Sequence, residues 1–521
     1  MKNFESVAQL KLAKLKDGQQ VTTKGYYTAG DGGDALYLIK TPQTFDGYGD
    51  HELANGNIAV LQLANGVADV KLFGAKGDDV NDDSDAIQAA LNKSKTVVFP
   101  TGVYAITKAL IIKDAQNISG NATIKIKDGA YTDTNFWMMT NTTKPIPYNY
   151  DAGVPFVNNI HISGLSFDGN SSGATMTGNV GAIFFDQSNF CTVDSVSIDN
   201  INQGGGGSPA IRLFYSNNAV VSNCDIQNTD RQGVGAYESS VAVSDCFIKN
   251  SKEREPVLCS THNPQQLQAG SMDIIRCELE NTTTTNGTHV VRFSGETSGS
   301  VRDCLITGLP TINGVYITYI EDHVITVEGN TIRDCLYGAL VESDGYKDLT
   351  FKNNRYENCE DGLRVNAASI NGIVRVIGET FNVTNQPIYL NFIDNMIVKD
   401  CFVDGGSEFS FASGMKSLVF SDNTIINTTV ASQCMYAIGS ALTSPAVMQG
   451  NIAHGNTADA FRFDGTGAVN GSVRVNGAGG SFVHFASMGD AYIWRNGANL
   501  YMKSFSYPTS VTDGVLVGTQ S

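Results

Sequence analysis

The sequence is poor in several features that define common classes of protein. Proline is scarce, at 12 of 521 residues, and segments with helical periodicity are nearly absent. No apolar stretch approaches the roughly 20 residues that a membrane-spanning helix requires, and the N-terminal segment has no continuous apolar core, so we expect no signal peptide. Acidic residues outnumber basic ones by 52 to 35, and the net charge of −17 argues against sequence-independent binding to nucleic acid.

The ten cysteines also lack the spacing of a metal or redox motif. There is no CxxC pair and no Cys–His ligand pattern. We therefore interpret the cysteines as small apolar packing groups, and expect reduced thiols, as in a protein that folds in a cytoplasm. No metal ion and no cofactor are expected.

What the chain does contain is glycine, at 54 residues, with frequent Asn, Ser and Thr, which is typical of a β-rich protein with many turns. Segments such as "VSNCDIQN", "VRDCLITG" and "FSDNTIIN" repeat one pattern: Cys or Asn, then an apolar anchor two residues later. The anchors recur about every 25 residues, an elastic period typical of a solenoid whose turns carry loops of different length. The clear anchors are Ile226, Ile248, Leu279, Ile306, Ile332, Tyr356, Phe381, Val403 and Ile425, with weaker copies at Phe167, Ile198 and Ile452.

A second short strand precedes many anchors, as in "GVYIT", "GALVE" and "GLRVN". Strand, turn, strand, turn at this period predicts coils of a parallel β-helix that share one apolar interior. Equivalent residues then stack about 4.8 Å apart, a spacing that suits a disulfide poorly. One predicted interior column contains Cys224, Cys246, Cys277, Cys304, Asn330, Asn354, Cys401 and Asn423. A second column, at a turn, contains Asn200, Asn228, Asn250, Asn281, Asn358 and Asn427, whose amides are predicted to bond to the next coil.

The stretch "LFGAKGDDVNDDSDAIQAAL" packs five aspartates ahead of an apolar helical run: Asp78, Asp79, Asp82, Asp83 and Asp85. Such a cluster can be an ion site, a catalytic cluster or a helix cap. The spacing lacks the glycine and the terminal glutamate of a calcium loop. We therefore predict a helix over 84–93, with Asp83 or Ser84 as N-cap, that covers the open end of the solenoid.

This stretch and the following "VVFPTGVYAIT" resemble the opening signature of the pectate-lyase-like family of single-stranded right-handed β-helix proteins. The preceding "VTTKGYYTAGDGGDALYLI" resembles the short N-terminal segment of bacteriophage tailspikes. The resemblance implies an all-β chain with four parts: an N-terminal tailspike-type segment (1–71), a capping helix and start of the solenoid (72–94), a substrate-binding and catalytic β-helix (95–455), and a small C-terminal β domain (456–521).

The same resemblance implies a function. Tailspikes are homotrimers in the virion tail that bind, and usually cleave, a bacterial capsule or O-antigen polysaccharide. The C-terminal β domain is expected to hold the trimer together, and the N-terminus to attach to the phage tail or to another spike. The resemblance supplies no catalytic motif, so candidate residues must come from geometry.

Alternation along the strands that precede the anchors predicts which side chains point outward. The outward column combines rings, amides, an acid and guanidinium groups, which together suit sugar rings and their hydroxyl or carboxylate substituents; an ordinary polar exterior is the alternative interpretation. Its members are Arg292, Tyr316, Thr318, Glu342, Arg364, Asn366, Tyr389 and Asn391.

Glycoside hydrolysis usually requires two carboxyl groups at a fixed separation. Glu342 is the leading candidate for the general acid, because it lies within a strand and beside Arg364. Asp344, Glu321 and Asp322 are candidates for the base or nucleophile, and Glu238 for substrate contact. A lyase that uses Arg364, Tyr389 and His323, and a spike that binds without cleaving, remain open alternatives.

Overall fold

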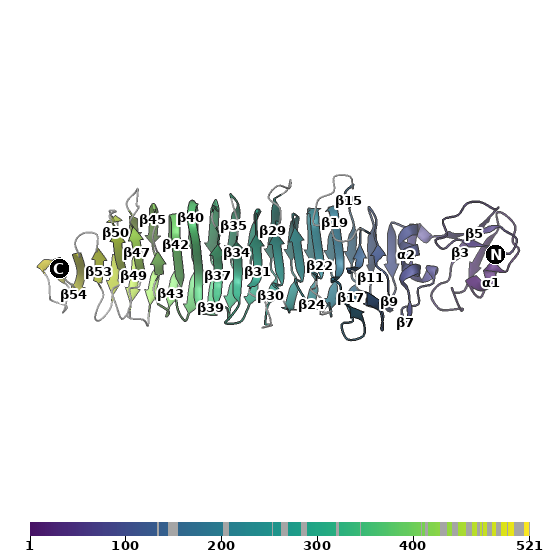
Figure 1. The fold of residues 1–521 in the computed structure, drawn as a ribbon, viewed down its shortest axis with the longest axis horizontal. Helices are drawn as coiled ribbons and strands as arrows, with labels where there is room; N and C mark the ends of the chain where they lie inside the picture. The colour runs from purple at the N-terminus through teal and green to yellow at the C-terminus, as the bar shows by residue number, and fades with distance from the viewer. Residues whose placement is uncertain are drawn as a thin grey trace. The chain divides into compact units, whose positions relative to one another are not determined.

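The protein was analysed as a computed structural model. It describes residues 1–132, 135–143, 155–201, 208–252, 254–261, 269–282, 289–318, 322–343, 345–407, 409–411, 415–427, 435–439, 446–454, 461–465, 469–470, 473–476, 482–485, 491–496, 499–504 and 515–519. The chain divides into two compact units, Met1–Lys252 and Glu253–Ser521. Both are built from the turns of a parallel β-solenoid, about 13 in all (Figure 1), so the predicted fold class is confirmed.

The first unit begins with a small sheet that precedes the solenoid. Its strand order is β1-β2-β3-β5-β4, with β1 parallel to β2 and the other pairs antiparallel. The elements of this segment are β1 (Lys2–Phe4), α1 (Val7–Lys11), β2 (Gln20–Thr23), β3 (Leu36–Lys40), β4 (His51–Glu52), β5 (Ile58–Gln62), η1 (Ala64–Gly66) and η2 (Val70–Phe73).

The coils of the first unit contribute strands to three parallel rows. Row 1 consists of β6 (Val67–Asp69), β8 (Thr96–Phe99), β11 (Asn117–Gly120), β16 (His161–Ser163), β20 (Thr192–Asp194), β23 (Ala219–Ser222) and β26 (Ser240–Ser244). Row 2 consists of β7 (Asp78–Asp82), β9 (Val103–Ile106), β12 (Thr123–Ile126), β17 (Ser166–Asp168), β21 (Ser197–Asp199), β24 (Asp225–Thr229) and β27 (Phe247–Ser251). Row 3 consists of β10 (Leu110–Ile111), β14 (Phe136–Thr140), β19 (Val180–Asn189), β22 (Ile211–Asn217) and β25 (Val234–Tyr237).

The second unit repeats the three rows. Row 1 consists of β29 (Gly270–Ile275), β32 (Thr297–Arg302), β35 (Val324–Glu328), β38 (Asp348–Lys352), β45 (Ser417–Ser421), β48 (Ala446–Gln449) and β51 (Val469–Asn470). Row 2 consists of β30 (Glu278–Glu280), β33 (Leu305–Thr307), β36 (Thr331–Arg333), β39 (Arg355–Cys359), β41 (Thr380–Val383), β43 (Phe402–Asp404), β46 (Thr424–Ile426), β49 (Asn451–His454) and β52 (Val473–Asn476). Row 3 consists of β28 (Val257–Ser260), β31 (His289–Ser294), β34 (Asn313–Thr318), β37 (Tyr337–Glu342), β44 (Phe409–Phe411), β47 (Met435–Gly439), β50 (Phe461–Gly465) and β53 (Phe482–Phe485).

Two long strands of this unit, β40 (Asp361–Ile377) and β42 (Ile388–Lys399), run from row 3 into row 1. Parallel pairing continues as far as β53, and three antiparallel strands follow: β54 (Ala491–Asn496), β55 (Asn499–Ser504) and β56 (Val515–Thr519). No helix in the described part of the chain is long and apolar enough to span a membrane.

The predicted anchors form the interior of row 2. Phe167, Ile198, Ile226 and Ile248 are in register in the first unit, and Leu279, Ile306, Ile332, Tyr356, Phe381, Val403 and Ile425 are in register in the second. All of them are buried. Ile452 was misplaced by one residue, because Ala453 and not Ile452 pairs with Ile425.

The interior column two residues before the anchors is a hydrogen-bonded ladder in the second unit. Asn330 Oδ1 accepts from the amide of Cys304, Asn354 Oδ1 accepts from the amide of Asn330, and Glu379 Oε1 accepts from the amide of Asn354, at 2.9, 2.9 and 3.1 Å. Polar side chains thus satisfy backbone groups that would be costly to bury unpaired. The nine described cysteines are buried and free, as predicted; Cys434 lies outside the described residues.

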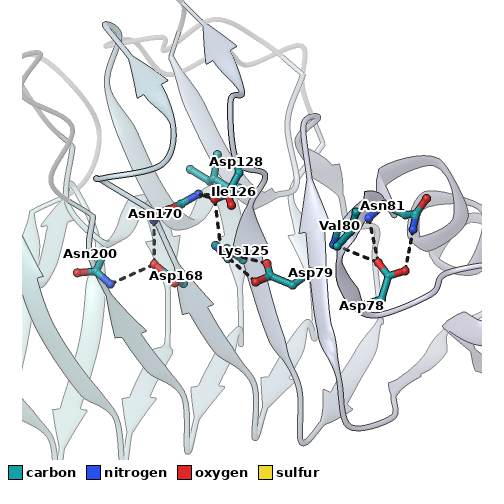
Figure 2. Close-up of polar contacts among 10 residues, drawn as sticks. All are labelled: Asp78, Asp79, Val80, Asn81, Lys125, Ile126, Asp128, Asp168, Asn170 and Asn200. Carbon is teal, nitrogen blue, oxygen red and sulfur yellow. Dashed lines mark hydrogen bonds and ion pairs between the residues drawn. The ribbon is translucent and has the colours of Figure 1, made fainter.

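The asparagine column lies at a turn, where all its members except Asn281 have the left-handed conformation that Asn tolerates better than most residues. Asn200 Nδ2 donates to Asp168 Oδ1 at 3.2 Å, and one coil earlier Asn170 Nδ2 donates to Asp128 Oδ1 at 2.7 Å (Figure 2). Bonds between neighbouring coils are confirmed, but they run to the preceding coil rather than to the next one. They are donated by Asn200, Asn228, Asn250, Asn358 and Asn427. Asn281 differs, since it donates to the carbonyl of His289.

The aspartate cluster is structural, and the predicted helix is α2 (Ser84–Lys93) with Asp83 as N-cap residue. α2 packs against β6, β8 and β10 through the buried Ile87 and Leu91, and burial of each side chain contributes about 1.5–3 kcal/mol. The Asp83 carboxylate accepts from the amides of Lys76 and Gly77, at 2.7 and 3.0 Å, rather than from the helix.

The other aspartates of the cluster also have partners. Asp78 accepts from the amides of Val80 and Asn81, and Asp79 forms an ion pair of 3.0 Å with Lys125 (Figure 2). Asp82 accepts from the amide and hydroxyl of Ser84, and Asp85 pairs with Lys108 on the surface. The cluster therefore connects the helix, the turn before it and the first coils.

Replacement of Asp83 by Ala is expected to lower the free energy of unfolding by about 1–3 kcal/mol, because the amides of Lys76 and Gly77 lose their acceptor in a buried place. Urea unfolding followed by far-ultraviolet circular dichroism measures this change. Asp85→Ala is the control, since its carboxylate makes only an exposed ion pair. Equal stability of the two variants would contradict the role given to Asp83.

Candidate functional site

The candidate face is formed by the row 3 strands of the second unit, where alternation is as predicted. Val291, Val315, Ala339, Leu363 and Ile388 are in register and fully buried in the interior. The next position along each strand faces the opposite side. There the register is Arg292, Tyr316, Leu340, Arg364, Tyr389 and Ser410.

Glu342 is the last residue of β37 and is exposed. It pairs in register with Thr318, whose hydroxyl donates to the Glu342 carbonyl at 3.1 Å. The Tyr316 hydroxyl donates to Glu342 Oε2 at 2.9 Å. A carboxylate and a phenol from neighbouring coils are thus in direct contact on the outer face.

The ring of Tyr316 is less open than predicted. It stacks on His289, with ring centroids 3.8 Å apart and an angle of 15°, and the Arg292 guanidinium carbon lies 5.7 Å from its centroid. Asn313 Nδ2 donates to His289 Nδ1 at 3.1 Å. Burial and the charges of Arg292 and Arg254 lower the pKa of His289 to about 3, so this histidine is neutral near pH 7. The sequence analysis did not identify His289 as part of the candidate face.

Arg364 is held by groups other than Glu342, which was its predicted neighbour. Its guanidinium donates to Asp361 Oδ2 at 3.2 Å and lies 5.3 and 4.6 Å from the rings of Tyr337 and Tyr389. Asp361 is buried and also accepts from the side chain of Asn385 at 2.8 Å. The Arg364 side chain is still 31% exposed, so a fixed guanidinium remains accessible to a ligand.

The other predicted residues are placed as follows. Asn366 and Asn391 pair in register along β40 and β42. Asp322 is exposed, and its amide donates to the carbonyl of Gly345 at 2.9 Å, so its turn contacts the turn that follows β37. Asp344 and Glu321 lie outside the described residues.

Glu238 belongs to the first unit, where it follows β25 and is buried. His323, which the lyase alternative requires, shares a hydrogen bond of 3.0 Å between its Nδ1 and the Ser298 hydroxyl. Among the described residues, His, Cys, Asp and Glu form no group of three that could hold a metal ion.

Comparison with known proteins identifies the class. Residues 67–254 match the family model described as "Rhamnogalacturonase A/epimerase, pectate lyase-like", and residues 313–484 match that of the right-handed beta helix region. These two parts of the chain are thus similar to pectate-lyase-like and right-handed β-helix proteins, which confirms the resemblance predicted from the sequence.

Particular relatives are more distant. A capsule K30/K69-specific depolymerase of Klebsiella phage K64-1 is 23% identical over 501 residues, which cover 86% of this chain and 60% of the relative. Thus the chain spans about three fifths of the length of that protein. A capsular polysaccharide depolymerase tailspike of the Acinetobacter baumannii bacteriophage Fri1 shares the fold, with a TM-score of 0.53 and 16% identity over 77% of this chain and 75% of that one.

Proposed function

We propose that the protein is a phage tailspike that binds a bacterial surface polysaccharide and cleaves its glycosidic bonds by hydrolysis. The observation that carries the proposal is the outer face of β34, β37, β40 and β42, where Tyr316, Glu342, Arg364 and Tyr389 come from consecutive strands. The depolymerase among the relatives supports the same class of substrate. The proposal includes a homotrimer in the virion tail, attached through its N-terminal segment.

Glu342 transfers the proton in this mechanism. The hydrogen bond from Tyr316 fixes one carboxylate oxygen. As the general acid, Glu342 donates its proton to the leaving glycosidic oxygen, while the second carboxyl group acts as base or nucleophile. Asp322, Asp344 and Glu321 are the candidates for the second carboxyl group.

Arg364 and Tyr389 bind the sugar in this mechanism. The Arg364 guanidinium offers fixed donors to hydroxyl or carboxylate groups, because Asp361 and the two tyrosine rings hold it in place. Arg292, on β31, and Asn366, on the same strand as Arg364, extend this contact surface.

Exposure of the protein to capsular and O-antigen polysaccharides from a panel of strains tests the proposal. A fall in polymer length, measured by size-exclusion chromatography, is expected for at least one polymer, without a new ultraviolet-absorbing double bond. Binding without shortening would instead indicate a spike that only adheres, and an unsaturated product would indicate a lyase.

Replacement of Arg364 by Ala is expected to weaken polymer binding about tenfold to a hundredfold, because a charge-assisted contact is lost. The dissociation constant is measured by calorimetry in a Glu342→Gln background, so that turnover does not consume the ligand. Arg355→Ala is the matched control, since this exposed arginine belongs to row 2. Equal affinity of the Arg364→Ala and Arg355→Ala proteins would remove Arg364 from the site.

A further inference from the structure

A compact pocket lies in the first unit. None of the residues that line it has a proposed catalytic role. Its volume is about 340 Å³, near the lower end of the range for small-ligand sites. It is lined by Tyr26, Tyr27, Thr28, Asp31, Lys71, Ala75, Lys76 and Asp78.

The aromatic wall of the pocket is fixed in place. The Tyr27 hydroxyl donates to the carbonyl of Gly74 at 2.9 Å, and the Tyr26 and Tyr27 rings meet edge to face at 4.8 Å. A Cβ at Gly74 would lie 2.7 Å from the Tyr26 ring, so the ring occupies space that only glycine leaves free. Tyr27 nevertheless remains 51% exposed. It therefore presents a rigid ring on which a ligand can stack without an ordering cost.

The carboxylates of the pocket already accept hydrogen bonds from the protein itself. Asp31 accepts from the amides of Tyr26, Tyr27, Thr28 and Gly33, at 2.7–3.0 Å. In the same way, Asp78 accepts from the amides of Val80 and Asn81 and from the Asn81 side chain (Figure 2). Both carboxylates therefore stabilise the loops that shape the pocket.

The two lysines interact with acids only at longer range, Lys76 with Asp78 and Lys71 with Asp69. Lys76 Nζ lies 5.0 Å from the centroid of the Tyr27 ring, and the stem of Lys71 passes beside Gly32, where an added Cβ would lie 3.0 Å from its Cδ. In the described part of the chain, neither ammonium group forms an ion pair. The hydrogen bonds that the pocket can still offer are thus mainly donors on two cations beside an exposed ring.

We propose that this pocket binds a hexuronate, a six-membered sugar ring that carries a carboxylate. The C–H face of the sugar stacks on Tyr27, and Lys71 and Lys76 bind the carboxylate and adjacent hydroxyl oxygens. An acidic peptide fits less well, because peptides are usually recognised along a groove or a strand edge. The proposal does not depend on cleavage, so it can hold even if Glu342 has no catalytic role.

Saturation-transfer NMR with the full chain tests this site, with sodium glucuronate and glucose observed directly and inorganic phosphate added as a competitor of glucuronate. The experiment is run in the Arg364→Ala background, which weakens the other sugar-binding surface. Glucuronate is expected to saturate the signal. Combined Lys71→Gln and Lys76→Gln substitutions should weaken its binding about tenfold or more, and Tyr27→Leu should also weaken it.

Lys95→Gln is the matched control, because this exposed lysine is not part of the pocket. Circular dichroism of each variant verifies the fold. Absence of saturable glucuronate binding, equal binding of glucose or of phosphate, or unchanged binding by the double lysine variant would each overturn the proposal.

Discussion

Glu342→Gln is expected to lower the turnover of polysaccharide cleavage by about two to four orders of magnitude, the usual scale of general acid–base catalysis. Glutamine keeps the shape of the side chain and an oxygen that can accept from the Tyr316 hydroxyl, now at 2.9 Å from Oε2. It cannot take up and release a proton in the required range. Polymer binding and stability should therefore be retained while the rate falls.

The rate is measured from the release of reducing ends, with Glu278→Gln as the matched control on row 2 of the same unit. Glu278 is exposed and belongs to another row, so its substitution should leave turnover unchanged. A near-normal rate for Glu342→Gln would show that the catalytic centre lies elsewhere, and the acids around Glu238 in the first unit would be the next candidates.

Glu379→Gln is expected to raise stability at neutral and alkaline pH. Glu379 occupies the interior column where other coils place Asn or Cys, and it is fully buried. Burial raises its pKa to about 8, although hydrogen bonds from Asn354 act in the opposite direction. The folded protein must therefore keep this carboxyl protonated or bury a charge.

The sign of the pH dependence follows from the two states. Between pH 4.5, the ordinary pKa, and about pH 8, the folded state keeps a proton that the unfolded state has released. Unfolding is thus favoured as pH rises, by up to about 1.4 kcal/mol per unit. Between these two pH values, Glu379 lowers the free energy of unfolding by on the order of 5 kcal/mol. The contribution of Glu379 is most favourable below pH 4.5 and is lost by about pH 8.

Urea unfolding from pH 5 to pH 9 measures the effect. The gain in stability from Glu379→Gln is expected to grow with pH and to level off above about pH 8. Glu360→Gln, at an exposed position in the same unit, is the control. A constant difference between the Glu379→Gln and wild-type proteins across this range would contradict the buried protonated state.

Much of the fold could be predicted from sequence because the solenoid repeats one local rule. Each anchor, such as Ile306 or Phe381, must be apolar to fill the shared interior, and the period brings equivalent anchors into register. The pattern nevertheless indicated two strands per coil where the structure has three rows. Strand propensity does not separate a short turn from a short strand, whereas pairing with the neighbouring coil does.

The candidate site was less predictable, because its contacts run between coils. Alternation correctly placed Tyr316, Arg364 and Tyr389 on one face, but it could not show that Tyr316 stacks on His289 or that Arg364 pairs with Asp361. Those choices depend on side-chain conformations across coils. One local feature could have indicated the ion pair: Asp361 lies three residues before Arg364 in the sequence.

The interior position of Glu379 could have been predicted from the repeat. It lies two residues before the anchor Phe381, the position that Cys or Asn occupies in other coils. An acid at an interior position predicts either a partner or a raised pKa. In the structure the pKa of Glu379 is raised, and hydrogen bonds from Asn354 offset part of the effect of burial.

The most direct test of the central claim is cleavage of a susceptible capsular polysaccharide in water enriched in the heavy oxygen isotope, followed by mass spectrometry of the oligosaccharides. Hydrolysis adds one water across each broken bond, its oxygen to the new reducing end and a proton to the leaving oxygen. Each cleavage by the wild-type protein should therefore place one heavy oxygen at a new reducing end, and Glu342→Gln should form almost no such products. Products without the heavy oxygen that contain a double bond, or products from Glu342→Gln at the wild-type rate, would contradict hydrolysis at this face.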